Sequence, residues 1–123
     1  GYFGMGVMYQ AKNDKKRAEE MFQKGAEAGE EKSAFEIGYI CSQRDDLKNA
    51  EKYYLIAANK GIIEAMYNLG NLYDYLEEYD KAEKYLKKAS ELGDKDAEVL
   101  LKKVEKNKKK VTRKWGTIYD NYI

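Results

Sequence analysis

The sequence repeats itself with a period of 32 residues, and this repetition limits the possible folds more than any other feature. Residues 65–93 align without a gap on residues 33–61, so that Gly70 falls on Gly38 and, one period earlier, on Gly6. Repetition at a fixed period of about this length is typical of helical repeat arrays, in which each unit packs only on its neighbours. We therefore expect an all-α solenoid of stacked antiparallel helix pairs. The same period matches Ala82 with Ala50, Glu83 with Glu51, Tyr85 with Tyr53, Ala89 with Ala57 and Gly93 with Gly61.

The helical spacing of the apolar residues and the turn residues between them set the expected boundaries. Gly29, Gly61 and Gly93 each follow the second helix of a pair, where a glycine can adopt the left-handed conformation that ends a helix. The expected helices cover about 2–11, 15–28, 32–42, 47–59, 64–76, 79–92 and 95–109. We expect a single domain over residues 1–123, with about three repeats at 1–32, 33–64 and 65–96 and capping helices over 97–123.

The C-terminal segment allows two interpretations. Val111, Trp115, Ile118 and Tyr122 are spaced by 4, 3 and 4 positions, which places them on one face of a helix. We expect residues 111–122 to form a separate capping helix over the end of the stack. The alternative is a frayed tail.

Small residues in phase explain how the helices could approach each other. Gly38 and Gly70 each lie 12 positions before an alanine, Ala50 or Ala82. We expect this spacing to set a missing side chain opposite a small one within each pair. The larger side chains fill the remaining volume, and burying one of them stabilises the fold by roughly 1.5–3 kcal/mol.

These phased residues resemble a known family. The Gly-to-Ala step of 12 positions and the Ala-to-Ala step of 7 are similar to tetratricopeptide repeats. The phrase KKASELGDKDA at 87–97, and its weaker copy LIAANKGIIEA at 55–65, is similar to the linker of Sel1-like repeats. The resemblance covers about residues 2–105, although the G-x-G-V loop of Sel1-like units and the Pro that ends many tetratricopeptide units are absent. It implies a right-handed α-solenoid that acts as a protein–protein adaptor.

Stacked helix pairs of this kind form a concave face lined by the first helix of each pair. The side chains expected there combine rings, which supply contact area, with amides, which can bond the main chain of an extended peptide. For each ring, the alternative is packing between units. The family's Lys/Asn/Arg clamp for a C-terminal carboxylate is not expected, because Phe35 and Tyr67 stand where such a clamp would use a Lys. The expected groove residues are Phe35, Glu36, Tyr39, Ser42, Tyr67, Asn68, Asn71, Asp74 and Tyr75.

A basic segment forms a second candidate site. Residues 1–101 carry 15 basic and 20 acidic side chains, whereas residues 102–123 carry 8 basic and 2 acidic ones. Such a segment can contact an acidic peptide, a nucleic acid or a lipid head group. We favour the alternative of a solvated helix end, because the segment lacks the interleaved aromatic residues that stack on single-stranded nucleic acid. The possible contacts to an anionic partner are Lys103, Lys106, Lys109, Lys110 and Arg113.

The sequence contains no catalytic constellation. The absence of His excludes imidazole chemistry and His metal ligation, and the paired carboxylates fall in turns, where they cap helices. Cys41 aligns with Tyr9 and Tyr73 at an interior position, so we interpret it as a buried filler rather than a nucleophile. We expect no enzyme activity, no cofactor, no metal site and no small-molecule substrate.

Other features bear on the setting of the chain. No stretch approaches the roughly 18 to 20 apolar residues of a membrane span. A single cysteine forms no internal disulfide, which favours a reducing, cytoplasmic compartment without fixing it. Because Gly1 falls inside a repeat, we expect the chain to be a trimmed piece of a longer protein.

The sequence thus predicts an adaptor that binds a peptide or protein partner in the concave groove. The alternative is a structural piece of a longer array whose basic C-terminal segment contacts a nucleic acid or a membrane surface. The oligomeric state stays open.

Overall fold

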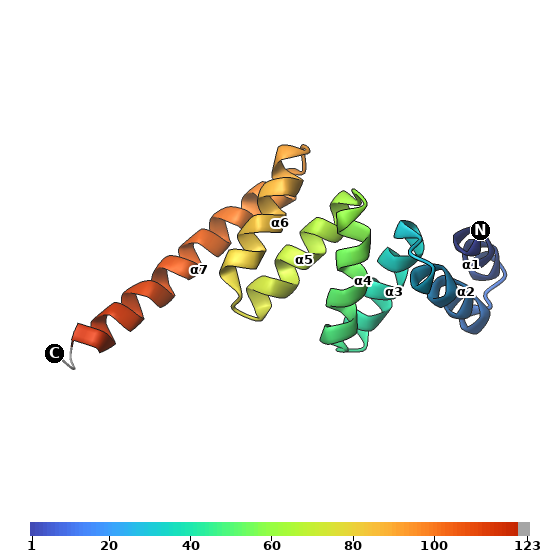
Figure 1. Cartoon of the computed structure of the whole chain (residues 1–123), viewed down its shortest axis with the longest axis horizontal. Coiled ribbons are helices and arrows are strands. Elements are labelled where there is room, and N and C mark those ends of the chain that lie inside the picture. Colours follow the sequence, from blue (N-terminus) through green and yellow to red (C-terminus); the bar gives the residue numbers. More distant parts are fainter. Residues whose placement is uncertain (121–123) are drawn as a thin grey trace. The chain divides into compact units, whose positions relative to one another are not determined.

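A computed structural model describes residues 1–120, with side chains up to residue 116, and this part forms seven helices and no strand (Figure 1). The helices are α1 (Tyr2–Ala11), α2 (Lys15–Glu27), α3 (Glu31–Gln43), α4 (Leu47–Asn59), α5 (Ile63–Tyr75), α6 (Tyr79–Glu91) and α7 (Lys95–Asp120). The predicted all-α helical-repeat class is confirmed, and the first six helices begin and end within two residues of the predicted positions.

The chain divides into two compact units, Gly1–Asn68 and Leu69–Ile123, and the division falls inside α5. In the first unit, α1 packs on α2, α2 on α3 and α3 on α4; in the second, α6 packs on α7. Successive helices therefore pair as the short turns require. The single domain and the three repeat boundaries stay predictions.

The backbone repeats with the period of the sequence. A turn residue with positive φ separates the helices within each pair, and a glycine with positive φ separates one pair from the next. These residues are Asn13, Asp45 and Glu77 (φ 61°, 59° and 59°) and Gly29, Gly61 and Gly93 (φ 82°, 98° and 98°). Asp14 and Asp46 then cap the next helix by accepting the N–H groups of Arg17 and Asn49 at 3.1 and 3.4 Å. The predicted glycine stops are therefore confirmed.

The paired helices approach closely at the predicted glycines, but the prediction of the residue that faces each glycine is wrong. A Cβ atom at Gly38 would lie 2.7 Å from Cδ1 of Tyr54, not against Ala50. The reason is side-chain direction: a ring on the second helix leans toward the N-terminus of that helix and covers the level of the glycine. The same offset of 16 positions pairs Gly6 with Phe22 and Gly70 with Leu86.

A second close approach joins neighbouring pairs in the first unit. Gly25 of α2 lies so near to Ser33 of α3 that a methyl group would not fit, and Ser33 is fully buried. The Ser33 hydroxyl donates to Glu30 at 3.0 Å, and the same carboxylate accepts the N–H groups of Tyr2 at 3.3 Å and Phe3 at 3.1 Å. Desolvation acts to raise the pKa of Glu30, but these hydrogen bonds outweigh it and hold that pKa below its ordinary value. Glu30 thus ties the α2–α3 turn to the start of α1.

The C-terminal segment is one continuous helix where the sequence predicted two. No Pro or Gly interrupts α7 before Gly116, so nothing local stops it near residue 110. Trp115 is 65% exposed, so its ring does not cover the end of a stack. The side chain of Ile118 and the whole of Tyr122 lie outside the described residues.

Candidate functional site

A groove with a volume of about 530 Å³ lies in the first unit, where α1, α2 and α3 meet. Its floor is apolar, because Ala18 and Phe22 of α2 are buried and Ile40 of α3 is partly buried. The small side chain of Ala18 leaves space that a larger residue would fill. The lining residues are Gln10, Asn13, Lys15, Ala18, Glu19, Phe22, Glu36, Tyr39, Ile40 and Arg44.

Two of the predicted groove residues, Glu36 and Tyr39, line this groove. They are three positions apart on α3, a spacing that puts both side chains on one side of the helix. Tyr39 is 48% exposed, so its ring offers contact area to a ligand. Glu36 is half-buried, and no described residue forms a hydrogen bond or ion pair with its carboxylate. Burial, followed by the charge of Glu64, raises the pKa of Glu36.

A bidentate ion pair between Arg44 and Glu19 lies at the edge of the groove. The Arg44 guanidinium donates to both carboxylate oxygens of Glu19, at 2.5 and 2.8 Å. These hydrogen bonds lower the pKa of Glu19. Because the pair joins α2 to the residue that follows α3, it fixes the edge of the groove and leaves neither charge free.

Three other predicted groove residues gather around Tyr54. The Phe35 ring packs against the Tyr54 ring with centroids 5.9 Å apart, and Asn68 Nδ2 donates to the Tyr54 hydroxyl at 3.3 Å. Ser42 also interacts with Tyr54, and its hydroxyl donates to the carbonyl oxygen of Tyr39 at 2.7 Å. These side chains therefore support the α3–α4 pair, which leaves less of their polar capacity for a ligand.

The remaining predicted residues lie on α5. Tyr67 is partly buried and Asn71 is exposed, while Tyr75 is 74% exposed. Asp74 accepts a hydrogen bond from Asn107 of α7 at 3.2 Å. Asp74 thus has a partner inside the second unit, whereas Asn71 and Tyr75 are open to solvent.

Sequence reasoning missed the contribution of α2 and of the turns. It assigned the groove to the first helices alone, but Lys15, Ala18 and Glu19 come from α2 and Arg44 follows α3. A signal was present in the small residue that the period places at 18, 50 and 82. Only the packed structure shows that the space beside Ala18 opens to the surface.

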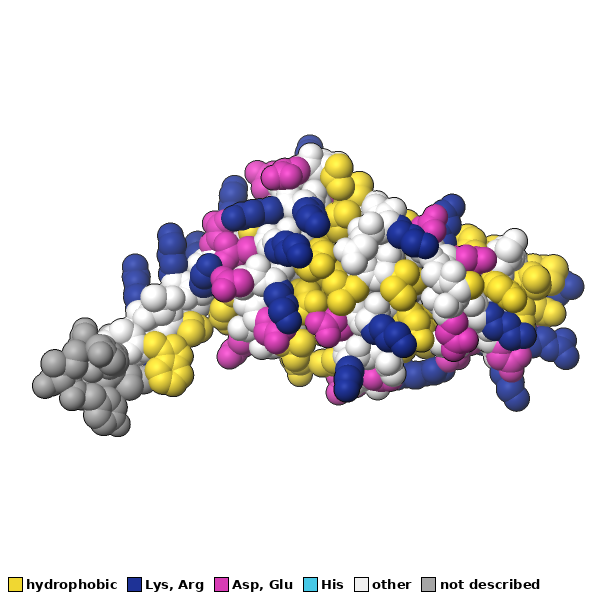
Figure 2. Space-filling view, viewed as in Figure 1, with side chains coloured by type: hydrophobic (Ala, Val, Ile, Leu, Met, Phe, Trp, Pro, Cys, Tyr) yellow, Lys and Arg dark blue, Asp and Glu magenta, His cyan; other side chains and the backbone are white. Residues whose placement is uncertain are grey.

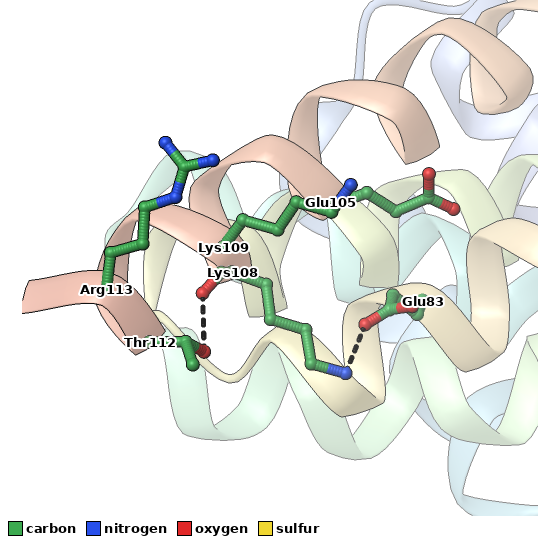
Figure 3. A pocket seen from close by; sticks show the side chains of 6 residues that line it. All are labelled: Glu83, Glu105, Lys108, Lys109, Thr112 and Arg113. Carbon is green, nitrogen blue, oxygen red and sulfur yellow. Dashed lines mark hydrogen bonds and ion pairs between the residues drawn. The ribbon is translucent and has the colours of Figure 1, made fainter. Parts of the chain in front are cut away.

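The basic candidate site lies along α7. Figure 2 shows Lys and Arg side chains along the part of this helix that is drawn at the left. A second groove there, of about 380 Å³, is lined by Lys109 and Arg113 together with the acidic Glu83 and Glu105 (Figure 3). The two carboxylates reduce the attraction of this groove for an anion. The predicted residues Lys103, Lys106, Lys109, Lys110 and Arg113 are all exposed.

Lys108 behaves differently from its basic neighbours. Its ammonium group lies 2.8 Å from Asp80 and 2.9 Å from Glu83, both on α6 (Glu83 is drawn in Figure 3). The hydrogen bonds that Lys108 donates to Asp80 and Glu83 raise the pKa of Lys108, and the one that Asp80 accepts lowers the pKa of Asp80. Lys108 thus joins α7 to α6 and is not free for a partner.

Among the described residues, no three His, Cys, Asp or Glu side chains are grouped so that they could hold a metal ion. None of the helices described combines the length and the apolar character needed to cross a membrane. Cys41 is half-buried, and burial followed by the charge of Asp46 raises the pKa of its thiol, which disfavours the reactive thiolate.

Comparison with known proteins finds a family model that matches part of the chain. No curated protein is detectably similar to the chain in sequence. The sequence model described as Tetratricopeptide repeat matches residues 63–96, which cover α5, the turn after it and α6. Repeats of this family generally mediate protein–protein interaction and typically form non-catalytic scaffolds. This match and the seven consecutive helices in the described part support a tetratricopeptide-like repeat protein.

Proposed function

We propose that this protein is an adaptor that binds a peptide or protein segment in the groove of the first unit. The observation that carries the proposal is the pairing of an apolar floor with the half-exposed Tyr39 and the unpaired Glu36. A ring beside an apolar floor offers contact area at low entropic cost. A half-buried carboxylate without a partner costs stability, so its presence is better explained by a ligand than by folding.

The other predicted groove residues do not line this groove, and Asn71 and Tyr75 belong to the second unit. Asn71 and Tyr75 on α5 have the exposure that contact with a partner requires. Phe35, Ser42 and Asn68 would act indirectly, because they hold the α3–α4 pair around Tyr54. We assign no catalytic role to the groove, since no described residue forms a hydrogen bond or ion pair with its one unpaired carboxylate.

The test uses a phage-displayed library of random linear peptides of about 12 residues, which reach about 40 Å when extended. Tyr39→Ala should weaken binding of the selected peptides by about tenfold or more, since an exposed ring at the centre of a contact carries much of the affinity. Trp115→Ala is the matched control, because it also removes an exposed ring but lies on α7. Equal affinities for the parent and Tyr39→Ala would reject the groove.

A second candidate function is contact with an anionic partner through α7. The five predicted basic residues on that helix are exposed, and no described acidic side chain pairs with any of them. If α7 has this function, the chain should bind duplex DNA or anionic vesicles with an affinity that falls steeply as salt rises. Lys109→Gln with Arg113→Gln should reduce that binding, and an absence of binding at low salt would dismiss it.

A further inference from the structure

The charge of the first unit is divided between its helices. α1 has no charged residue, and α3 carries Glu31, Lys32 and Glu36. Lys32 lies at the start of α3, with its ammonium group 5.6 Å from the ring centroid of Phe3, and it does not line the groove. The basic side chains of this unit lie mainly on α2 and α4, the second helices of the pairs.

Within the groove, the charges do not have equal weight. Glu19 and Arg44 satisfy each other through two hydrogen bonds. Lys15 is exposed at the start of α2, so water screens its charge. Glu36 is half-buried, and an incompletely hydrated charge interacts more strongly with a ligand than an exposed one does.

No cation among the described residues compensates the charge of Glu36. A nearby ammonium or guanidinium group would lower the pKa of this carboxyl, whereas burial and Glu64 raise it. Glu64 is itself exposed and negative, so the surroundings of Glu36 repel an anion and attract a cation. This is opposite in sign to a pocket that recognises a carboxylate.

We propose that the segment bound in this groove is basic, and that one of its Lys or Arg side chains pairs with Glu36. A neighbouring apolar side chain of the same segment lies on the floor formed by Ala18, Phe22 and Ile40. An Arg suits the position best, because its guanidinium can engage both carboxylate oxygens at once. The inference rests on the proposed function and adds the chemical class of the partner and the residue that selects it.

The experiment reads the composition of the peptides that the library yields on the parent chain. We expect enrichment of Lys or Arg next to an apolar residue. Glu36→Gln should weaken those peptides by about tenfold or more, because it removes one half of a partly desolvated ion pair. Glu20→Gln is the matched control: it removes the same charge from an exposed position on α2 outside the groove and should change affinity by less than about twofold.

Several outcomes would overturn the inference. Selected peptides that are neutral or acidic, and that bind Glu36→Gln as well as the parent, would reject it while leaving the groove intact if Tyr39→Ala still weakens them. A selection that yields no peptide, or peptides that Tyr39→Ala does not weaken, would reject the proposed function and the inference together. Self-association without peptide that Glu36→Gln abolishes would make the basic α7 of a second copy the occupant and would overturn the assignment to a separate partner.

Discussion

Helices α3 and α7 occupy the same position in the repeat but are used differently. They are separated by two periods, so Ser33 corresponds to Ala97 and Gly38 to Lys102. Ser33 and Ala97 are both fully buried, so α7 keeps the side that packs on the preceding helix. The side that receives the following helix is changed, because the buried Gly38 becomes the exposed Lys102.

The turn after the helix changes as well. Asp45, with a φ of 59°, ends the α3 segment and starts the return of the chain, whereas its counterpart Lys109 is helical and α7 continues to Asp120. Within the described residues, α7 keeps the contact surface for the preceding helix and carries exposed charge where α3 receives α4. A few positions in each repeat thus decide whether a helix can pack closely on a following helix.

The largest change in stability is expected at Gly38, which corresponds to Lys102 of α7. Gly38→Lys places a side chain where a Cβ atom alone would come within 2.7 Å of the Tyr54 ring, and it buries a charge there. We expect the free energy of unfolding, measured with urea, to fall by more than about 3 kcal/mol. The mirror change Lys102→Gly lies on a solvated face and should cost about 1 kcal/mol or less, which is the difference in helix propensity. Similar losses in the free energy of unfolding for the two variants would contradict the proposed difference between α3 and α7.

A smaller effect tests whether the rule for α3 also holds for α1. Gly6 lies one period before Gly38, and a methyl group there would meet the buried ring of Phe22. We expect Gly6→Ala to lower the free energy of unfolding by about 1–3 kcal/mol. Gly4, two positions earlier, has no atom within 4 Å of its would-be methyl group, so Gly4→Ala should raise stability by up to about 1 kcal/mol. If both variants are stabilised in urea denaturation, the close approach of α1 and α2 is not required.

These glycines also show how much of the structure can be predicted from the sequence. The helix boundaries and the turn residues were predicted because capping, positive φ and apolar period are local properties. The residue that faces Gly38 was not predicted, since the direction of the Tyr54 ring depends on how the two helices pack. The continuity of α7 was missed because a face of apolar residues, here Val111 and Trp115, does not reveal where a helix stops. Of the residues predicted on the first helices, Glu36 and Tyr39 line the groove of the first unit, whereas the lining from α2 depends on tertiary packing.

The turn supplies a prediction of intermediate size. Asp45→Val puts a β-branched side chain at a φ of 59°, which should lower the free energy of unfolding by about 1–2 kcal/mol. Lys109→Val introduces the same valine at a helical, exposed position and should lower the free energy of unfolding by well under about 1 kcal/mol. Thermal unfolding followed by circular dichroism separates the two. Equal midpoints would show that the turn conformation is not what distinguishes α3 from α7.

The smallest expected effect concerns Glu36, whose counterpart in α7 is the buried Leu100. Burial, followed by Glu64, raises the pKa of Glu36 above the ordinary value of 4.5, so the folded state holds this proton more tightly than the unfolded state. Ionisation therefore costs stability at neutral pH, and the cost disappears as pH falls below the unfolded value. Glu36→Gln should raise the free energy of unfolding at neutral pH by less than about 1 kcal/mol, because the carboxylate is only partly buried, and this gain should vanish in acid. Urea denaturation over a pH series, with Glu20→Gln as the surface control, measures the difference. A variant that is less stable than the parent at neutral pH would mean that Glu36 has a stabilising partner within the chain, and the reason for assigning it to a ligand would be lost.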